Sequence, residues 1–207
     1  DQASTTANVT TKSLTATAST ANKVYDGTTT AATTLTFSGL IGSETLGQTV
    51  GSTFNNKNVG AGKTVTVNSI TLANGSNGGL AANYSISPGQ TTTANVTAKA
   101  LTATASTANK VYDSTTSANT TLSLSGLIGS ETLNVTANST FDNKNIGSGK
   151  TVTVNSITLA NGTNGGLATN YSIATSQTTT ATVTAKPLIV SGITASNKSY
   201  DTTTSVS

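Results

Sequence analysis

Three aspartates offer the clearest chemistry that the residue types allow. Asp26 and Asp113 each follow a tyrosine and lie 87 residues apart, and Asp201 follows a third tyrosine. A Ca²⁺ ion needs about six to eight oxygen ligands with several carboxylates, and too few acidic residues lie near these positions. Each Asp is therefore predicted to cap a turn by accepting from the backbone N–H two residues further on, so no metal and no cofactor are expected. The motif residues, which are structural rather than a site, are Tyr25, Asp26, Tyr112, Asp113, Tyr200 and Asp201.

An internal isopeptide cross-link is the second chemistry that the residue types allow. Lys23 would supply the amine and Glu44 the carboxylate that shuttles protons. Asn58 or Asn68 would supply the amide. The reaction requires a buried lysine with a lowered pKa. Because spacing alone does not place these residues together, an ordinary surface lysine is the preferred interpretation, and the cross-link stays an alternative.

The composition removes most catalytic and metal chemistry. The chain has no His and no Cys, which excludes imidazole bases, His or thiolate metal sites and disulfides. Its ten basic residues are all lysine, whereas phosphate and base recognition usually enlists arginine, so no nucleic-acid partner is expected despite the net charge of +3. No catalytic residue is identified, and we expect a protein that is not an enzyme.

A membrane span is also not expected. No apolar run approaches the roughly 18 residues that a span needs, so the chain is predicted not to insert into a membrane. Any targeting or anchoring segment of an exported parent protein is expected outside these residues.

The elements that position these residues belong to a repeat. The stretch from Leu14 to Thr29 returns from Leu101 to Thr116, and a divergent third copy opens at Leu188. The period of 87 residues is the size of one small domain, whereas solenoid coils repeat at roughly 20 to 50 residues. The predicted division is the tail of a preceding repeat at 1–13, a first domain at 14–100, a second domain at 101–187 and the start of a third repeat at 188–207.

Alternating apolar residues indicate β-strands throughout. Leu14, Ala16 and Ala18 share one face of a strand, and the polar residues between them share the other. The inward parity changes between Val67 and Ile70, which predicts a bulge near Asn68 and Ser69. Helix is expected only as a turn around 79–81. The predicted fold class is all-β, with small tandem β-sandwich domains, Ig-like in broad architecture and mostly antiparallel, joined end to end in a rod.

Equivalent aromatic residues are expected to pack equivalently in the two domains. The pairs are Tyr25 and Tyr112, Phe54 and Phe141, and Tyr84 and Tyr171.

The turn and the linker carry two further expectations. Position 27 is Gly27, but its counterparts are Ser114 and Thr202, and a β-branched residue disfavours positive φ, so a left-handed backbone is not expected there. The linkers are taken to be Lys99 with Ala100 and Lys186 with Pro187, too short for independent tumbling. Contacts at these junctions are expected to raise the stability of two repeats above that of one.

Four blocks, all present in both repeats, resemble the YDG repeat family; in the first repeat they are Asn22–Thr29, Phe54–Val67, Asn83–Ile86 and Val96–Thr102. The copies depart from the motif at Ser114 and Thr202, where its glycine is lost. The family occurs in tandem in large bacterial surface proteins similar to filamentous haemagglutinins and other secreted adhesins. The resemblance implies a repetitive stalk or adhesive region at the cell surface or outside the cell, with no catalytic residues.

Two functions follow as expectations. The first is a non-enzymatic stalk whose partners are the neighbouring repeats of the same chain. The second is a module whose own loops bind glycan or a host or bacterial surface protein, which would call for an exposed aromatic or charged cluster. Asn-x-Ser/Thr sequons are frequent, as chance predicts in this composition, and glycosylation is left open.

Overall fold

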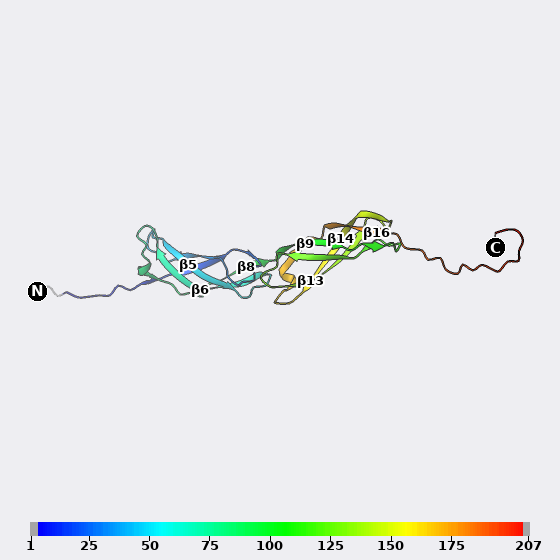
Figure 1. The fold of residues 1–207 in the computed structure, drawn as a ribbon. Coiled ribbons are helices and arrows are strands. Elements are labelled where there is room, and N and C mark those ends of the chain that lie inside the picture. The colour runs from blue at the N-terminus through cyan, green and yellow to red at the C-terminus, as the bar shows by residue number, and fades with distance from the viewer. Residues whose placement is uncertain (1–3, 205–207) are drawn as a thin grey trace. The chain divides into compact units, whose positions relative to one another are not determined.

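The computed structural model describes residues 4–204, and these are almost entirely strand and turn (Figure 1). The helices among them are two single 3₁₀ turns, η1 (Ala81–Asn83) and η2 (Ala168–Asn170), so the predicted all-β class is confirmed. None of the described helices is long and apolar enough to cross a membrane.

Packing divides the chain into two compact units that do not coincide with the repeats. The first unit comprises the chain up to Thr104 together with Leu122–Thr136 and Ile157–Thr175. The second comprises Ala105–Thr121, Ala137–Ser156 and the chain from Ser176 onward. The first unit therefore contains the first repeat together with three segments of the second repeat, 101–104, Leu122–Thr136 and Ile157–Thr175.

The first repeat forms three small sheets. The orders are β3-β8-β6-β5, β2-β4 and β1-β7. Figure 1 shows β6 beside β5 and β8, both of which it pairs in antiparallel fashion. The short pairs β1·β7 and β3·β8 are parallel, a feature that the alternation pattern does not reveal. The strands are β1 (Lys12–Ser13), β2 (Thr15–Thr20), β3 (Lys23–Val24), β4 (Thr33–Ser38), β5 (Leu46–Phe54), β6 (Gly60–Asn74), β7 (Tyr84–Ser85) and β8 (Thr91–Thr97).

The second repeat has the same strand order at the same offset. Its sheets are β10-β16-β14-β13-β11 and β12-β9-β15, in which β9 replaces both β1 and β2. The short pairs β9·β15 and β10·β16 are again parallel. The strands are β9 (Lys99–Thr107), β10 (Lys110–Val111), β11 (Ser117–Ala118), β12 (Thr120–Ser125), β13 (Leu133–Phe141), β14 (Gly147–Asn161), β15 (Tyr171–Ile173) and β16 (Gln177–Thr184).

The predicted bulge lies in β6. Gly51 of β5 pairs with Ser69, but the next residue of β5 pairs with Val67, which leaves Asn68 without a partner in the ladder. The extra residue reverses the side-chain parity of the strand. Val65 and Val67 therefore face the core on one side of the bulge, and the strand continues on the other side with the opposite parity. The bulge prediction is confirmed.

The aromatic residues form the centre of each core, with one exception to the expected equivalence. Phe54 and Phe141 are both buried, as are Tyr84 and Tyr171. Tyr25 is 1% exposed, whereas its counterpart Tyr112 is only half-buried and packs at the edge of the second core. Equivalent packing is therefore wrong for this pair, because residues of the second repeat cover Tyr25.

The expected linker is part of a strand. Lys99 and Ala100 open β9 and pair with Tyr171 and Ser172, so only Ala98 separates β8 from β9. The linker prediction at these two residues is wrong because the parallel partner β15 extends the strand to the end of the preceding repeat.

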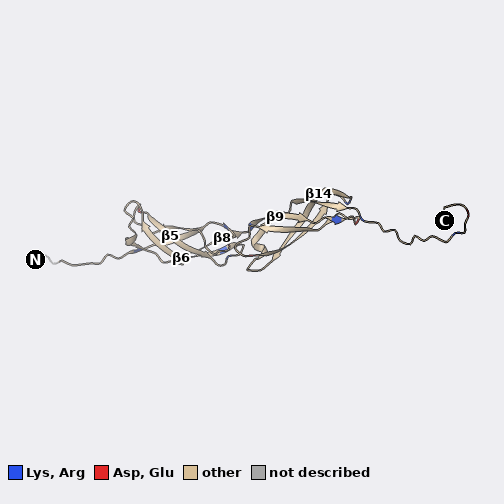
Figure 2. Ribbon diagram, viewed as in Figure 1, with Lys and Arg blue, Asp and Glu red and all other residues tan. Residues whose placement is uncertain are grey.

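Charged residues are few over the described ribbon (Figure 2). Each described aspartate pairs with a lysine close to it in the sequence, as Asp26 does with Lys23 and Asp142 with Lys150.

Candidate functional site

The Tyr-Asp motif forms a capped turn. Asp26 Oδ1 accepts from the Thr28 backbone N–H at 2.8 Å and pairs with Lys23 Nζ at 2.7 Å. Hydrogen bonds from Lys110, and then from Thr115, lower the pKa of Asp113 to about 2. The predicted turn cap is confirmed. The same two contacts recur in the other copies. Asp113 accepts from the Thr115 N–H and pairs with Lys110, and Asp201 accepts from the Thr203 N–H and pairs with Lys198.

The backbone of this turn contradicts the expected geometry. Gly27, Ser114 and Thr202 all have positive φ, at 78°, 64° and 65°. A non-glycine residue in the left-handed region costs roughly 1–2 kcal/mol. The hydrogen bonds that the Asp accepts and its ion pair with the lysine three residues earlier offset that cost. The turn therefore keeps its shape without glycine. The prediction that the backbone is not left-handed at this position is wrong.

Removal of divalent cations is expected to leave thermal stability unchanged. Within residues 4–204 no three acidic or other metal-ligating side chains gather closely enough to hold an ion, because each motif Asp is paired with its own lysine. A ligand that binds only the folded state would raise the melting temperature, and its removal would lower it. Calorimetry with and without EDTA measures this, and a fall of several degrees would contradict the assignment.

The four isopeptide candidates lie in separate hydrogen-bond networks. Lys23 Nζ donates to the carbonyl oxygens of Thr28 and Thr30. Glu44 accepts from the hydroxyl of Tyr84, and Asn68 donates to Thr53 Oγ1. Asn58 bonds to an asparagine of the second repeat.

The buried lysine of the first repeat is Lys63. Burial lowers the pKa of its amine, and Nζ donates to Asn56 Oδ1 at 2.6 Å. Among the described residues no carboxylate is bonded to it, so the proton shuttle of a cross-link is missing there.

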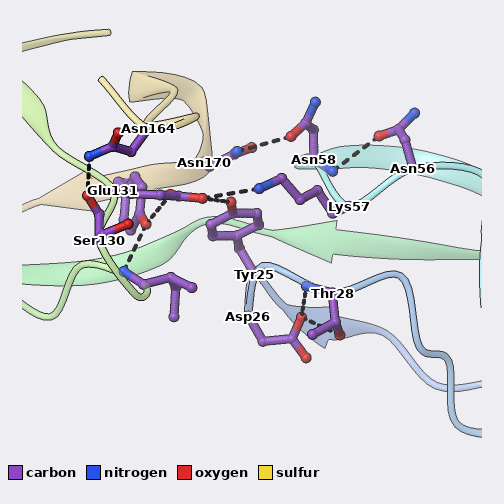
Figure 3. Close-up of polar contacts among 12 residues, drawn as sticks. Tyr25, Asp26, Thr28, Asn56, Lys57, Asn58, Ser130, Glu131, Asn164 and Asn170 are labelled. Atoms are coloured by element: carbon purple, nitrogen blue, oxygen red, sulfur yellow. Dashed lines mark hydrogen bonds and ion pairs between the residues drawn. The ribbon is translucent and has the colours of Figure 1, made fainter. Parts of the chain in front are cut away.

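A buried glutamate joins the two repeats within the first compact unit (Figure 3). Glu131, in the turn that precedes β13, is 7% exposed. Its Oε1 accepts from the Tyr25 hydroxyl at 2.6 Å and from Lys57 Nζ at 3.1 Å, and both donors belong to the first repeat. Its Oε2 accepts from the hydroxyl of Tyr171 at 2.6 Å. One carboxylate therefore connects three side chains from two repeats.

Aromatic contacts support the same carboxylate. The rings of Tyr25 and Tyr171 meet edge to face, with centroids 5.5 Å apart. Lys57 Nζ lies 5.9 Å from the centroid of the Tyr25 ring. The Tyr171 hydroxyl also accepts from the backbone N–H of Ile128 at 3.0 Å, which fixes the loop that carries Glu131.

The pKa shifts describe an ionised carboxylate that accepts from two neutral tyrosine hydroxyls and one charged lysine. Burial acts to raise the pKa of Glu131, but hydrogen bonds from Tyr171, Tyr25 and Lys57 outweigh it and hold the pKa below its usual value. Burial, with the bond to Glu131, raises the pKa of Tyr171 to about 12. The hydrogen bond to Glu131 raises the pKa of Lys57, so this amine stays charged and is no nucleophile. The cluster therefore holds an ionised carboxylate between hydrogen-bond donors from both repeats.

Asn170 makes a second connection between the repeats. It is 0% exposed, and its Oδ1 accepts from the backbone N–H of Val59 at 3.0 Å. Its Nδ2 donates to Asn58 Oδ1 at 3.1 Å. Asn58 is held in turn by its own N–H, which donates to Asn56 Oδ1.

Gly27 provides close approach at this junction. A Cβ placed on Gly27 would lie 2.8 Å from Ile128 Cγ2, closer than real side chains come. The glycine of the motif therefore allows the loop of the second repeat to approach the turn of the first.

The first repeat carries the same residues in a different environment. Glu44 accepts from the Tyr84 hydroxyl, which accepts from the N–H of Ile41 at 3.1 Å. Yet Glu44 is half-buried and Asn83 is exposed. Sequence reasoning missed the junction residues, although the repetition of Lys57, Glu44 and Asn83 at the 87-residue spacing was a usable signal.

Comparison with known proteins assigns the family and no more. No curated protein and no solved structure matches the chain. The sequence model of the YDG domain matches twice, over residues 10–94 and 97–181, which together include most of the chain. The blocks quoted above lie within or at the edges of these matches, and the chain belongs to the YDG domain family.

Proposed function

We propose that the chain is a non-enzymatic stalk or spacer of a large bacterial cell-surface or secreted adhesin, built of small β-sandwich repeats that extend an adhesive region from the cell. The observation that carries the proposal is the burial of Glu131 by donors from both repeats. A spacer can hold an adhesive region at a set distance from the cell only if successive repeats keep a fixed orientation to one another.

The energetics of the junction favour such a fixed relation. Hydrogen bonds to a charged group typically contribute about 1.5–3 kcal/mol each, and the carboxylate of Glu131 accepts two such bonds from the first repeat. Separation of the repeats would break these bonds and expose to water the apolar residues packed around them. Leu101, 5% exposed, lies in the core shared by the two repeats and adds hydrophobic stabilisation.

The chemistry of the chain supports a structural role. Glu131 and Lys57 are both engaged and charged, and the described aromatic residues other than Tyr200 are at least half-buried. The adhesin setting and the extracellular location rest on the family resemblance. The alternative, in which the repeats bind glycan or a host protein, would gain support from saturable binding in a glycan and cell-binding screen of the whole chain.

Small-angle scattering tests the spacer proposal. Strands of 15 residues such as β6 and β14 span about 50 Å each at roughly 3.3 Å per residue. Two repeats laid end to end should therefore give a maximum dimension of about 100 Å plus the terminal segments. The Glu131→Ala variant serves as the comparison and should broaden the distance distribution. A compact particle, or a wild-type distribution as broad as the variant's, would overturn the proposal.

A further inference from the structure

An early strand and the last strand of each repeat run in the same direction where they pair. In the first repeat β3, which follows the opening strand β2, pairs in parallel with the end of β8. In the second repeat β10 pairs in the same way with the end of β16. We call these two pairs, with the hydrogen bonds directly beside them, the parallel clamps. Each clamp closes the long segment of chain that lies between its two strands.

Hydrogen bonds on both sides extend each clamp. In the first repeat the Tyr25 N–H donates to the carbonyl oxygen of Thr97 at 2.8 Å, and the Asn95 N–H donates to Asn22 Oδ1 at 2.7 Å. The same two bonds recur in the second repeat, and their partners are Tyr112 with Thr184 and Thr182 with Asn109. The asparagine side chain therefore adds a bond to a ladder of only two residue pairs.

Tension along the chain acts differently on parallel and antiparallel pairs. In a parallel pair the pulled ends lie at opposite ends of the two strands, so the strands must slide past each other and all the bonds between them carry the force together. In an antiparallel pair joined by a loop, the pulled ends lie side by side, and the bonds break one after another. A parallel pair therefore resists tension better than an antiparallel pair with the same number of bonds.

The antiparallel pairs of the first repeat are all connected in the weaker way. β2·β4, β5·β6 and β6·β8 are each joined by the chain at one end and pulled at the other. In β5·β6, for example, the pulled ends are Leu46 and Asn74, which pair with each other. Tension that reached these sheets would therefore open them one residue pair at a time.

A second parallel pair shares the load in each repeat. β1 pairs with β7, beside a bond of 2.8 Å from the Leu14 N–H to the Ser85 carbonyl oxygen, and the start of β9 pairs with β15. Leu14 and its counterpart Leu101 are both buried, so sliding of this strand also displaces an apolar side chain from the core. β4, β5 and β6 come under tension only after β1·β7 and β3·β8 have both opened.

We propose that each repeat has the further function of resisting tension along the chain, and that its parallel clamp sets this resistance. The inference rests on the proposed spacer role, because a stalk is pulled when the adhesive region that it carries is bound to a surface. It also assigns a purpose to the capped turn. Lys23 pairs in the clamp through its backbone, and its Nζ bonds to the carbonyl oxygens of Thr28 and Thr30. The turn is thus fastened to the strand that carries the force.

Pulling the whole chain at constant force, through tags at its two ends, tests the proposal. Forced unfolding is governed by the unfolding rate. Removal of a bond that is broken at the barrier raises this rate by the bond's full contribution, whereas removal of a bond that is still intact there leaves the rate unchanged. Opening of a clamp frees the 74 positions between Lys23 and Thr97, a lengthening of about 250 Å at full extension. Steps of this size mark the failure of one repeat.

The clamp variant carries Asn22→Ala and Asn109→Ala, which remove one bond from each clamp. Both asparagines are exposed, so the buried core is unchanged. A hydrogen bond of ordinary strength corresponds to a factor of about five in an equilibrium or rate constant, and the steps should therefore occur about fivefold faster.

The matched control carries Asn68→Ala and Asn155→Ala. These asparagines are equally exposed, and each donates from one strand to a threonine of the neighbouring strand, β6 to β5 and β14 to β13. Their bonds lie outside the clamps and are still intact when the clamps open. The control should lower the urea midpoint about as much as the clamp variant does, but change the stepping rate under force by less than about twofold.

Equal acceleration by the two variants, or no acceleration by the clamp variant, would overturn the proposal. Scattering from the unstretched chain does not depend on the order in which bonds break under force. A negative result here would therefore leave the spacer proposal standing, and a compact particle in scattering would remove the spacer without changing the stepping rates.

Discussion

The Glu131→Ala variant should lose about 3–5 kcal/mol of unfolding free energy, because hydrogen bonds to a charged group contribute about 1.5–3 kcal/mol each and two of the donors are buried tyrosine hydroxyls. The substitution removes the acceptor of the Tyr25 and Tyr171 hydroxyls and of Lys57. Both hydroxyls would stay buried without a partner, which costs more than the bonds themselves contribute. Urea unfolding followed by circular dichroism measures the change.

The first repeat supplies a matched control for this variant. Glu44 occupies the equivalent position and bonds to Tyr84, but no donor from another repeat reaches it within the described part of the chain. Glu44→Ala should therefore cost about 1 kcal/mol or less. Equal losses at Glu44 and Glu131 would show that the carboxylate stabilises only its own loop and does not hold the two repeats together.

The same carboxylate should give an acid-dependent stability. Because the pKa of Glu131 is held below its ordinary value of 4.5 in the folded state, its contribution is present above that pH and is lost as the pH falls through the folded-state pKa. Other depressed carboxyls, such as Asp113, add to the acid dependence of the wild type. The difference between wild type and Glu131→Gln isolates Glu131 and should shrink as the pH falls below 4.5. A difference that stays constant with pH would contradict the shift.

The strands could be predicted because their information is local. Alternation around Leu14 and the parity change near Asn68 each involve residues within a few positions of one another. The Asp26 cap is equally local, since it spans two residues. The positive φ of the residue after the Asp could not be predicted in this way. The preference of a single β-branched residue for negative φ takes no account of the hydrogen bonds that hold the whole turn.

The junction could not be predicted because its partners are far apart in sequence. Tyr25 and Glu131 are separated by 106 positions, and nothing in the alternation of either strand indicates which end of one repeat meets the other. Repetition conceals the difference further, since Glu44 and Glu131 lie in nearly identical sequences but only one is covered. Gly27 is a similar case, because its close contact with Ile128 depends on the neighbouring repeat.

The Asn170→Ala variant should lose about 2 kcal/mol of unfolding free energy, whereas Asn83→Ala should change it by less than about 0.5 kcal/mol. The two asparagines end equivalent 3₁₀ turns, η2 and η1, and both precede a Tyr-Ser pair. Asn170 alone is fully buried and accepts from the N–H of Val59. Removal of the Asn170 side chain leaves that donor without its acceptor beside the shared core, whereas Asn83 is already exposed to water.

A double-mutant cycle assigns the loss to the junction rather than to the turn. Asn58 receives the second hydrogen bond of Asn170, so Asn58→Ala and Asn170→Ala should not be additive, with a coupling of about 1 kcal/mol. Asn145→Ala, the equivalent change in the second repeat, should be additive with Asn170→Ala, because Asn145 is exposed and Asn170 bonds to Asn58 and Val59 instead. Additivity in both cycles would mean that Asn170 stabilises only its own repeat, and the fixed relation on which a spacer depends would then rest on Glu131 alone.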